Sequence, residues 1–250
     1  LTWSLSTNAT FLNLGASSGI LSGTPDNSRI GLHFVNVSVS DGKGGIAFHA
    51  FTLTVMNVND PPVINTTDIT VCNEDVFYKV AYVGYDPDPT HDELTWELWT
   101  NASFLSVSQD NATIMGLPKN EDVGKYWVNV SVNDGNGARA FHNFTLTVKN
   151  INDAPHWTNI PKNSTLQDFA TLVFDVNASD LDAGDVLTYT VSSIPISSIA
   201  IDKHTGVMTW KPGATGKYAI LLTATDGTAT IYHTFSIEVV HTNYLPTANL

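Results

Sequence analysis

Acidic residues are concentrated in short segments, where several carboxylates could act together. Residues 86–96 read DPDPTHDELTW and place Asp86, Asp88, Asp92 and Glu93 within eight positions. Such a cluster is compatible with a catalytic acid–base pair, with a site for a hard cation, or with a solvated turn whose aspartates accept bonds from backbone N–H groups. To choose among these readings, the pattern must be followed along the chain.

The chain repeats itself with a period of 93 residues. Leu-Thr-Trp at 1–3 returns at 94–96 and again as Leu-Thr-Tyr at 187–189. The segment VSVSDG at 37–42 returns as VSVNDG at 130–135 and more loosely as LTATDG at 222–227. This period is too long for a solenoid repeat and matches a β-sandwich domain of about 100 residues.

The period divides the sequence into four segments. We expect repeat 1 over residues 1–60 with its N-terminal part missing, repeat 2 over 61–153, repeat 3 over 154–245, and the start of a further repeat or a tail over 246–250. We therefore expect a piece of a longer protein. Asn-Asp-Pro-Pro at 59–62 and Asn-Asp-Ala-Pro at 152–155 form the linkers, where proline limits the freedom of the backbone.

Each repeat is predicted to be all-β. Residues 34–39 and 127–132 alternate apolar and polar side chains at period 2, as do residues 51–55 and 144–148. Turn signals such as Asp-Gly and Pro-Asp separate these segments, and no helix is predicted.

Composition narrows the range of partners. Acidic residues outnumber basic ones 24 to 11, and the net charge of −13 argues against nucleic acid and anionic membrane surfaces but is compatible with cations. The single cysteine, Cys72, cannot form an intrachain disulfide and is expected to be an inert thiol. No apolar stretch is long enough for a membrane span.

The acidic cluster follows the repeat. Asp-Pro-Asp at 86–88 has a counterpart in Asp-Leu-Asp at 180–182, and a third aspartate (Asp92 or Asp185) comes before the same strand in both copies. Ca²⁺ takes six to eight oxygen ligands from carboxylates, amides and carbonyls, and the linkers and Asp-Gly loops offer more of them. A cation site and solvated turns both remain open, and Asp92 and Asp185 fit either reading.

These motifs resemble dystroglycan-type cadherin-like repeats, which occur in tandem in bacterial and archaeal surface proteins. The resemblance rests on Asp-x-Asp followed by Leu-Thr-Tyr/Trp, on TGVMTWKP at 205–212, on Gly-Lys-Tyr at 124–126 and 216–218, on the Asp-Gly loops and on Asn-Asp-x-Pro. It implies tandem Greek-key cadherin/Ig-like β-sandwich domains in an elongated rod, with Ca²⁺ at the domain junctions.

The resemblance also implies a ligand set. At the junction of repeats 1 and 2 it gives Asn59, Asp60, Asp86, Asp88 and Asp134. At the junction of repeats 2 and 3 it gives Glu74, Asn152, Asp153, Asp180, Asp182 and Asp226. The chain departs from cadherins at Asn57 and Asn150, where they have an aspartate, and we cannot place their Asp-Arg-Glu motif.

The junction after repeat 3 departs further. Gln167 replaces the equivalent of Glu74, and Asn-Tyr-Leu-Pro at 243–246 replaces Asn-Asp-x-Pro. Because a tyrosine is no carboxylate ligand, we expect this junction to be poor in calcium and more flexible.

Other reactive side chains favour structural roles. His49, His142 and His233 occupy one strand position in three separate repeats, so they are not expected to share a zinc ion. The acids sit at turn positions that follow the repeat, so no enzyme activity is predicted. Trp3 and Trp96 recur as core residues, whereas Trp99 or Trp157 could offer an exposed platform for sugar.

Asn-x-Ser/Thr glycosylation motifs are frequent and indicate an extracellular glycoprotein. They begin at Asn8, Asn36, Asn65, Asn101, Asn111, Asn129, Asn143, Asn163 and Asn177. N-linked glycans on Asn36 and Asn129, which share one strand position, would coat one face of the sandwich. Together with the lack of disulfides, these motifs favour an archaeal surface protein.

The function predicted from the sequence is a structural or adhesive segment of a large extracellular protein at the cell surface. It would be a stalk, filament, sheath or surface-layer element stiffened by calcium, and exposed strand edges could pair with other copies. The alternatives are a spacer or carbohydrate-binding accessory region of a secreted hydrolase, or an adhesion module that binds a specific partner or surface glycans.

Overall fold

The computed structural model describes residues 1–89, 92–109 and 112–241. Backbone contacts divide the chain into two compact units. Unit 1 comprises residues 1–72, 77–117 and 124–147, and unit 2 comprises residues 73–76, 118–123 and 148–250. Strands dominate both units, and none of the described residues forms a helix long and apolar enough to cross a membrane.

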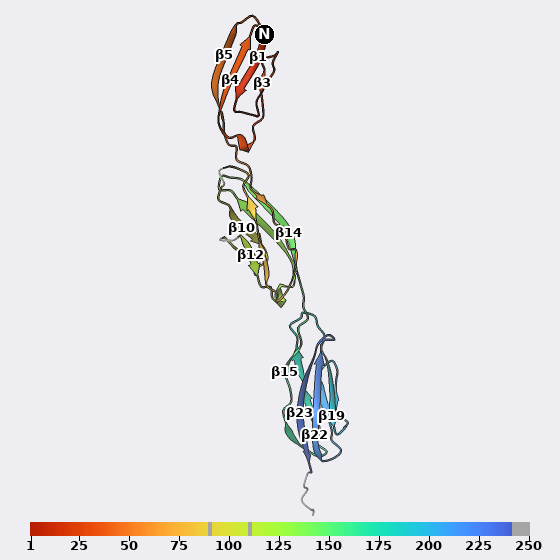
Figure 1. Cartoon of the computed structure of the whole chain (residues 1–250). Coiled ribbons are helices and arrows are strands. Elements are labelled where there is room, and N and C mark those ends of the chain that lie inside the picture. The colour runs from red at the N-terminus through yellow and green to blue at the C-terminus, as the bar shows by residue number, and fades with distance from the viewer. Residues whose placement is uncertain (90–91, 110–111, 242–250) are drawn as a thin grey trace, which may run out of the picture. The chain divides into compact units, whose positions relative to one another are not determined.

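Unit 1 begins with a three-stranded antiparallel sheet in the order β1-β4-β5 (Figure 1). Its strands are β1 (Thr2–Thr7), β4 (Gly31–Ser40) and β5 (Ile46–Val55), with a short ladder of β2 (Asn13–Leu14) and β3 (Leu21–Ser22). The hairpin between β4 and β5 turns at Asp41, whose Oδ1 accepts hydrogen bonds from the backbone N–H groups of Lys43 and Gly45. These bonds lower the pKa of the Asp41 carboxyl and hold the turn.

The rest of unit 1 is a β-sandwich. One sheet has the order β10-β13-β14-β7, from strands Thr95–Thr100, Gly124–Asn133, Arg139–Lys149 and Val71–Asn73. The other has the order β11-β12-β8, from Ser106–Ser108, Thr113–Gly116 and Tyr78–Ala81. β6 (Val63–Ile64) pairs with β9 (Gly84–Tyr85). Trp96, Ile114, Val130 and Leu146 fill the core.

Unit 2 repeats this sandwich. One sheet has the order β16-β23-β22-β19, from strands Ser164–Gln167, Thr230–Val240, Gly216–Thr225 and Thr188–Ile194. The other has the order β17-β21-β20, from Leu172–Asp175, Val207–Trp210 and Ala200–Ile201. β15 (His156–Asn159) pairs with β18 (Asn177–Ser179). β16 runs parallel to β23, so the chain must cross over between them.

Period-2 alternation explains these strands. In β22, Tyr218, Ile220, Leu222 and Ala224 are buried, while most residues between them are less buried. The four alternating segments predicted from the sequence lie in β4, β5, β13 and β14. The prediction of an all-β fold of tandem β-sandwiches is therefore confirmed.

The structure differs from the sequence prediction in two short 3-10 helices. They are η1 (Asn27–Arg29) and η2 (Asn120–Asp122), which lie 93 residues apart. Three-residue helices leave no periodic pattern in the sequence, so the search for helical periodicity could not detect them.

We expect Leu222→Ala to lower the free energy of unfolding of repeat 3 by about 2–5 kcal/mol, because Leu222 has no exposed surface and the change leaves a cavity. Denaturant unfolding followed by fluorescence measures this loss. Tyr232→Ala is the control, since its ring is 66% exposed and its removal should change stability by less than about 0.5 kcal/mol. Equal effects of the two changes would contradict the assignment of the core.

Candidate metal centres

The two Asp-x-Asp segments form matching turns. Asp86 follows β9 and accepts a hydrogen bond from the N–H of Asp88 at 2.8 Å, and Asp180 follows β18 and accepts one from the N–H of Asp182 at 3.0 Å. These bonds use Oδ1 of each first aspartate. Oδ2 of Asp86 and of Asp180 is buried and has no hydrogen-bond partner. Formation of the turn thus uses one carboxylate oxygen of Asp86 and one of Asp180, and the other oxygen of each remains available to a cation.

The linker aspartates lie against these turns. The N–H of Asp60 donates to Oδ2 of Asp88 at 2.9 Å, and the N–H of Asp153 donates to Oδ2 of Asp182 at 2.8 Å. Asp88 is 1% exposed and Asp182 is 6% exposed, and Oδ1 of Asp182 is buried without a partner. A hydrogen bond therefore joins the linker backbone to the second aspartate of each turn.

The linker asparagines reach the Asp-Gly loops. Asn59 Nδ2 donates to Oδ2 of Asp134 at 2.7 Å, and Asn152 Nδ2 donates to Oδ2 of Asp226 at 3.0 Å. The Asn59 amide, followed by backbone N–H groups of the loop, lowers the pKa of Asp134. The pKa of Asp226 is lowered chiefly by the N–H of Ala229, with Asn152 contributing. Both loop aspartates therefore favour the ionised form that a cation requires.

The sequence analysis missed two asparagines at these sites. Asn27 of η1 donates from Nδ2 to Oδ2 of Asp60 at 2.7 Å and to the carbonyl oxygen of Pro87 at 3.2 Å. Asn120 of η2 donates in the same way to Oδ2 of Asp153. The signal that could have found them is Pro-x-Asn at 25–27 and 118–120, which follows the period of the chain.

The sequence left open whether Asp92 and Asp185 are ligands or turn residues, and both lie close to the other carboxylates of their clusters. Carboxylate oxygens of Asp86, Asp88 and Asp92 lie within 4.8 Å of one another, and so do those of Asp180, Asp185 and Asp226. Partial desolvation raises the pKa of the Asp185 carboxyl although the residue is exposed, and the charges of Asp182, Asp180 and Asp226 raise this pKa further. Like charges therefore repel one another at this position when no cation is bound.

Glu74 lies at the linker of unit 2. Its side chain has no exposed surface, and Oε1 accepts a hydrogen bond at 2.7 Å from the N–H of Ile151, the residue before Asn152. Oε2 is buried and has no partner. Glu74 therefore contacts the linker that carries Asn152 and Asp153.

The contacts define two sets of residues. Site 1, in unit 1, comprises Asn27, Asn59, Asp60, Asp86, Asp88, Asp92 and Asp134. Site 2, in unit 2, comprises Glu74, Asn120, Asn152, Asp153, Asp180, Asp182, Asp185 and Asp226. All eleven sequence-predicted ligands are among them.

Both sites fit a hard cation. Their ligand atoms are carboxylate, amide and carbonyl oxygens, as Ca²⁺ prefers. Among the described residues, none of the ion pairs includes an acid of either site. Buried carboxylates without a countercharge carry a large desolvation cost, which a bound divalent cation would offset.

The end of repeat 3 is built differently. Asp168, and not Gln167 as expected from the sequence, stands where Glu74 does: both acids are buried, and the N–H of Asp168 donates to the carbonyl oxygen of Val240 as that of Glu74 does to that of Lys149. Oδ2 of Asp168 lies 2.6 Å from Nδ1 of His241. The loop between β21 and β22 contains no 3-10 helix in the described part of the chain and offers no asparagine between Trp210 and Gly216. Residues 243–246 and the segment 246–250 lie outside the described residues.

The remaining candidates have mostly structural surroundings. His142 pairs with Asp68, and His233 contacts the carbonyl oxygen of Pro161. Burial raises the pKa of the Cys72 thiol. The prediction that Trp157 could offer an exposed platform for sugar is wrong, because its side chain is partly buried against the core of repeat 3. Trp99, the other candidate, is 61% exposed.

The described asparagines of the glycosylation motifs are all exposed or half-buried, and half of them lie in strands: Asn36, Asn129, Asn143 and Asn177. Oδ1 atoms of Asn8, Asn101 and Asn163 accept backbone N–H groups of a facing strand, which leaves Nδ2 available. Asn111 lies outside the described residues.

Comparison with known proteins agrees with the fold. Residues 59–147 match the family described as "Bacterial Ig domain", and residues 154–240 match the family described as "Putative Ig domain". The search of curated proteins finds no match.

Solved structures with the same fold are cadherin repeats. Extracellular cadherin domains 1–5 of protocadherin gamma B2 align with a TM-score of 0.59 and 17% identity over 98% of this chain, which spans 53% of that structure. Repeats EC21–23 of human CDH23 align with a TM-score of 0.59 and 15% identity, covering 94% of this chain and 88% of that one. Repeats EC22–24 of mouse cadherin-23 give 0.53 and 17%, covering 96% and 86%. The chain is thus a tandem protein of Ig-like and cadherin-like β-sandwich domains.

Proposed function

We propose that this chain is a calcium-stiffened structural and adhesive segment of an extracellular surface protein. Sites 1 and 2 would each hold Ca²⁺ at a linker between repeats. The observation that carries the proposal is the duplication of one oxygen-rich cluster with buried carboxylate oxygens that have no partner. Turns that served only the backbone would have no need of these additional charges.

A bound cation would act mechanically. In each site the linker, the Asp-x-Asp turn and the Asp-Gly loop are joined by hydrogen bonds, for example Asp60 to Asp88 and Asn59 to Asp134. Ca²⁺ would supply the positive charge that lets the carboxylates stay ionised at close range. The linker would then lose freedom, and the tandem would stiffen.

The proposal also includes the location, source, glycosylation and assembly of the protein. Cell-surface placement, an archaeal source and N-linked glycans are supported by the glycosylation motifs and by the cysteine content. Assembly with other copies into a filament or layer would use exposed strand edges. The low-calcium junction after repeat 3 is supported by the sequence Asn-Tyr-Leu-Pro at 243–246 and by the hydrogen bond that joins Asp168 to His241.

Calcium titration of residues 1–250, reversed by EGTA, tests the proposal. A ligand that binds only the folded state raises stability by RT ln(1 + [L]/Kd), or about 2.7 kcal/mol at a hundredfold excess over Kd. We expect calcium to raise the melting temperature and to increase the maximum dimension measured by small-angle X-ray scattering. If neither quantity changes, the aspartates only stabilise turns and do not bind calcium.

Single-site variants separate the two centres. Asp88→Ala should remove the calcium response of site 1 and Asp182→Ala that of site 2, as measured by isothermal titration calorimetry. Asp202→Asn is the matched control, because Asp202 accepts hydrogen bonds from the N–H groups of His204 and Thr205 in an ordinary turn. The double variant should bind no calcium, and residual binding would contradict a calcium-poor third junction.

The repulsion at Asp185 gives a pH-dependent test. Its raised pKa means that the ionised form destabilises the folded state, a cost that is absent below about pH 4 and grows as the pH rises through the raised pKa. In EGTA, Asp185→Asn should therefore raise the melting temperature at pH 7 and leave it unchanged at pH 3. The same variant should reduce the calcium-induced shift at pH 7. A fall in metal-free stability at pH 7 would show that Asp185 is a structural turn residue.

A further inference from the structure

Three aromatic side chains are exposed on the outward face of the sheet β10-β13-β14. Trp99, Trp127 and Phe141 are 61%, 51% and 52% exposed. Exposed aromatic residues that gather on one face mark an interaction site more often than isolated ones do. These three surround two asparagines that begin glycosylation motifs.

The strand register fixes this arrangement. Trp99 of β10 lies opposite Asn129 of β13, and Asn129 Nδ2 donates a hydrogen bond to Oδ1 of Asn143 on β14 at 2.7 Å. Trp127 and Phe141 precede Asn129 and Asn143 by two residues on the same strands. Since alternate residues of a strand share a face, each aromatic ring lies beside an asparagine.

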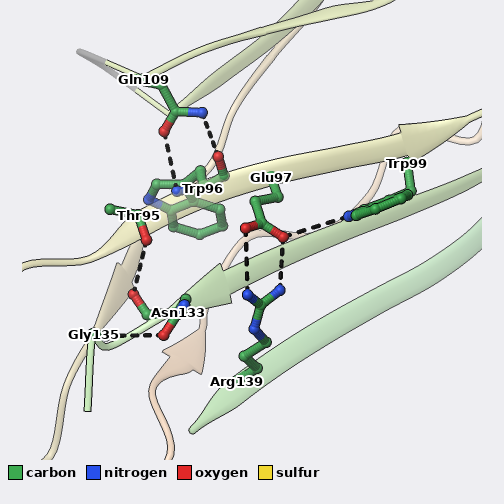
Figure 2. A network of polar contacts seen from close by, with 8 residues as sticks. All are labelled: Thr95, Trp96, Glu97, Trp99, Gln109, Asn133, Gly135 and Arg139. Atoms are coloured by element: carbon green, nitrogen blue, oxygen red, sulfur yellow. Dashed lines mark hydrogen bonds and ion pairs between the residues drawn. The ribbon is translucent and has the colours of Figure 1, made fainter. Parts of the chain in front are cut away.

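An ion pair orients the indole of Trp99. Figure 2 shows Arg139 of β14 reaching Glu97 of β10, and one pair of their atoms is 2.7 Å apart. Trp99 Nε1 donates to the same Glu97 oxygen at 3.4 Å. The guanidinium, followed by the indole N–H, lowers the pKa of Glu97. The ring is therefore held in place while most of its surface stays in solvent.

The fold itself does not require Trp99 or Asn143. At the positions equivalent to Trp99, repeats 1 and 3 have Ser6 and Ser192. At the position equivalent to Asn143, they have Ala50 and Thr234. Both repeats form the same hairpin without an aromatic ring at the first position or an amide at the second, although Phe48 and Tyr232 stand where repeat 2 has Phe141. Trp99 and Asn143 are therefore the residues of this face that are particular to repeat 2.

The two asparagines differ in accessibility. Asn129 is engaged through Nδ2, its Oδ1 is buried, and the hydroxyl-bearing Ser131 of its motif is 1% exposed. Asn143 is exposed, and its Nδ2 has no hydrogen-bond partner among the described residues. Asn143 is therefore the acceptor that the geometry favours, with Asn129 positioning its side chain.

We propose that Asn143 carries an N-linked glycan whose first pyranose rings pack on Phe141, Trp127 and Trp99. The faces of aromatic rings attract the C–H groups of a sugar ring, as they attract other apolar and weakly positive groups. The inference rests on the extracellular placement in the proposed function and does not depend on calcium.

The attachment is a group transfer. Nδ2 of Asn143 forms a bond to the anomeric carbon of a lipid-phosphate-linked oligosaccharide, and the bond from that carbon to the phosphate oxygen breaks. The lipid phosphate leaves, and Nδ2 gives up one proton to the transferring enzyme. No electrons are exchanged with an oxidant or reductant.

Secretion of the chain from an N-glycosylating host tests the proposal. Glycopeptide mass spectrometry should find Asn143 occupied. The glycosylated protein should melt about 4 °C above the same chain made in a host without N-glycosylation. Asn143→Gln, Trp99→Ala and Phe141→Ala should each abolish this glycan-dependent difference. Asn65→Gln is the control, because Asn65 is exposed and has Val63 rather than an aromatic residue two positions before it, and it should leave the difference unchanged.

Three results would overturn the inference. The first is an unmodified Asn143 in a chain whose other motifs are occupied. The second is a glycan-dependent difference that persists in Trp99→Ala and Phe141→Ala. The third is binding of free N,N′-diacetylchitobiose to this face when Asn143 is unmodified, which would make the patch a receptor for other glycans. A calcium titration of the same samples reports separately on the proposed function.

Discussion

The need to compensate buried carboxylates organises the linkers of this protein. Glu74, Asp88, Asp134 and Asp182 are almost fully removed from solvent, yet no arginine or lysine among the described residues pairs with them. Backbone N–H groups and asparagine amides satisfy some of their oxygens. Such donors stabilise the ionised form, but they do not neutralise several acids that lie within 5 Å of one another.

This constraint explains why asparagine accompanies aspartate in both sites. An amide can donate to one carboxylate while its own oxygen faces elsewhere, so it joins neighbouring acids without adding charge. Asn27 and Asn59 do this in site 1, and Asn120 and Asn152 do it in site 2. The same two contacts occur in both sites because the linker and the short helix recur with the period of the chain.

The sequence predicted those parts of the sites that depend on local motifs and on the period. Asp-x-Asp, Asn-Asp and Asp-Gly could be read directly, and their repetition indicated that they act together. Asn27 and Asn120 were not predicted as site residues, because each is positioned by a three-residue helix and such a helix has no periodic signature in the sequence. The exposed position of Trp99 and the partly buried position of Trp157 depend on packing across the sandwich, which spacing along the chain does not report.

The repeats share their linkers and cores but differ on their outward faces. Sites 1 and 2 match residue by residue except for Glu74, which belongs to site 2 alone, and the alternation that buries Val130 also buries Ile220 and Leu222. By contrast, the face that carries Trp99, Arg139 and Asn143 in repeat 2 has serine, alanine, isoleucine or threonine at many equivalent positions elsewhere. Linker chemistry must match wherever one domain is joined to the next, whereas an outward face is free to vary because the sandwich is stable without it. The outward faces are therefore where each domain of such a tandem can acquire a role of its own.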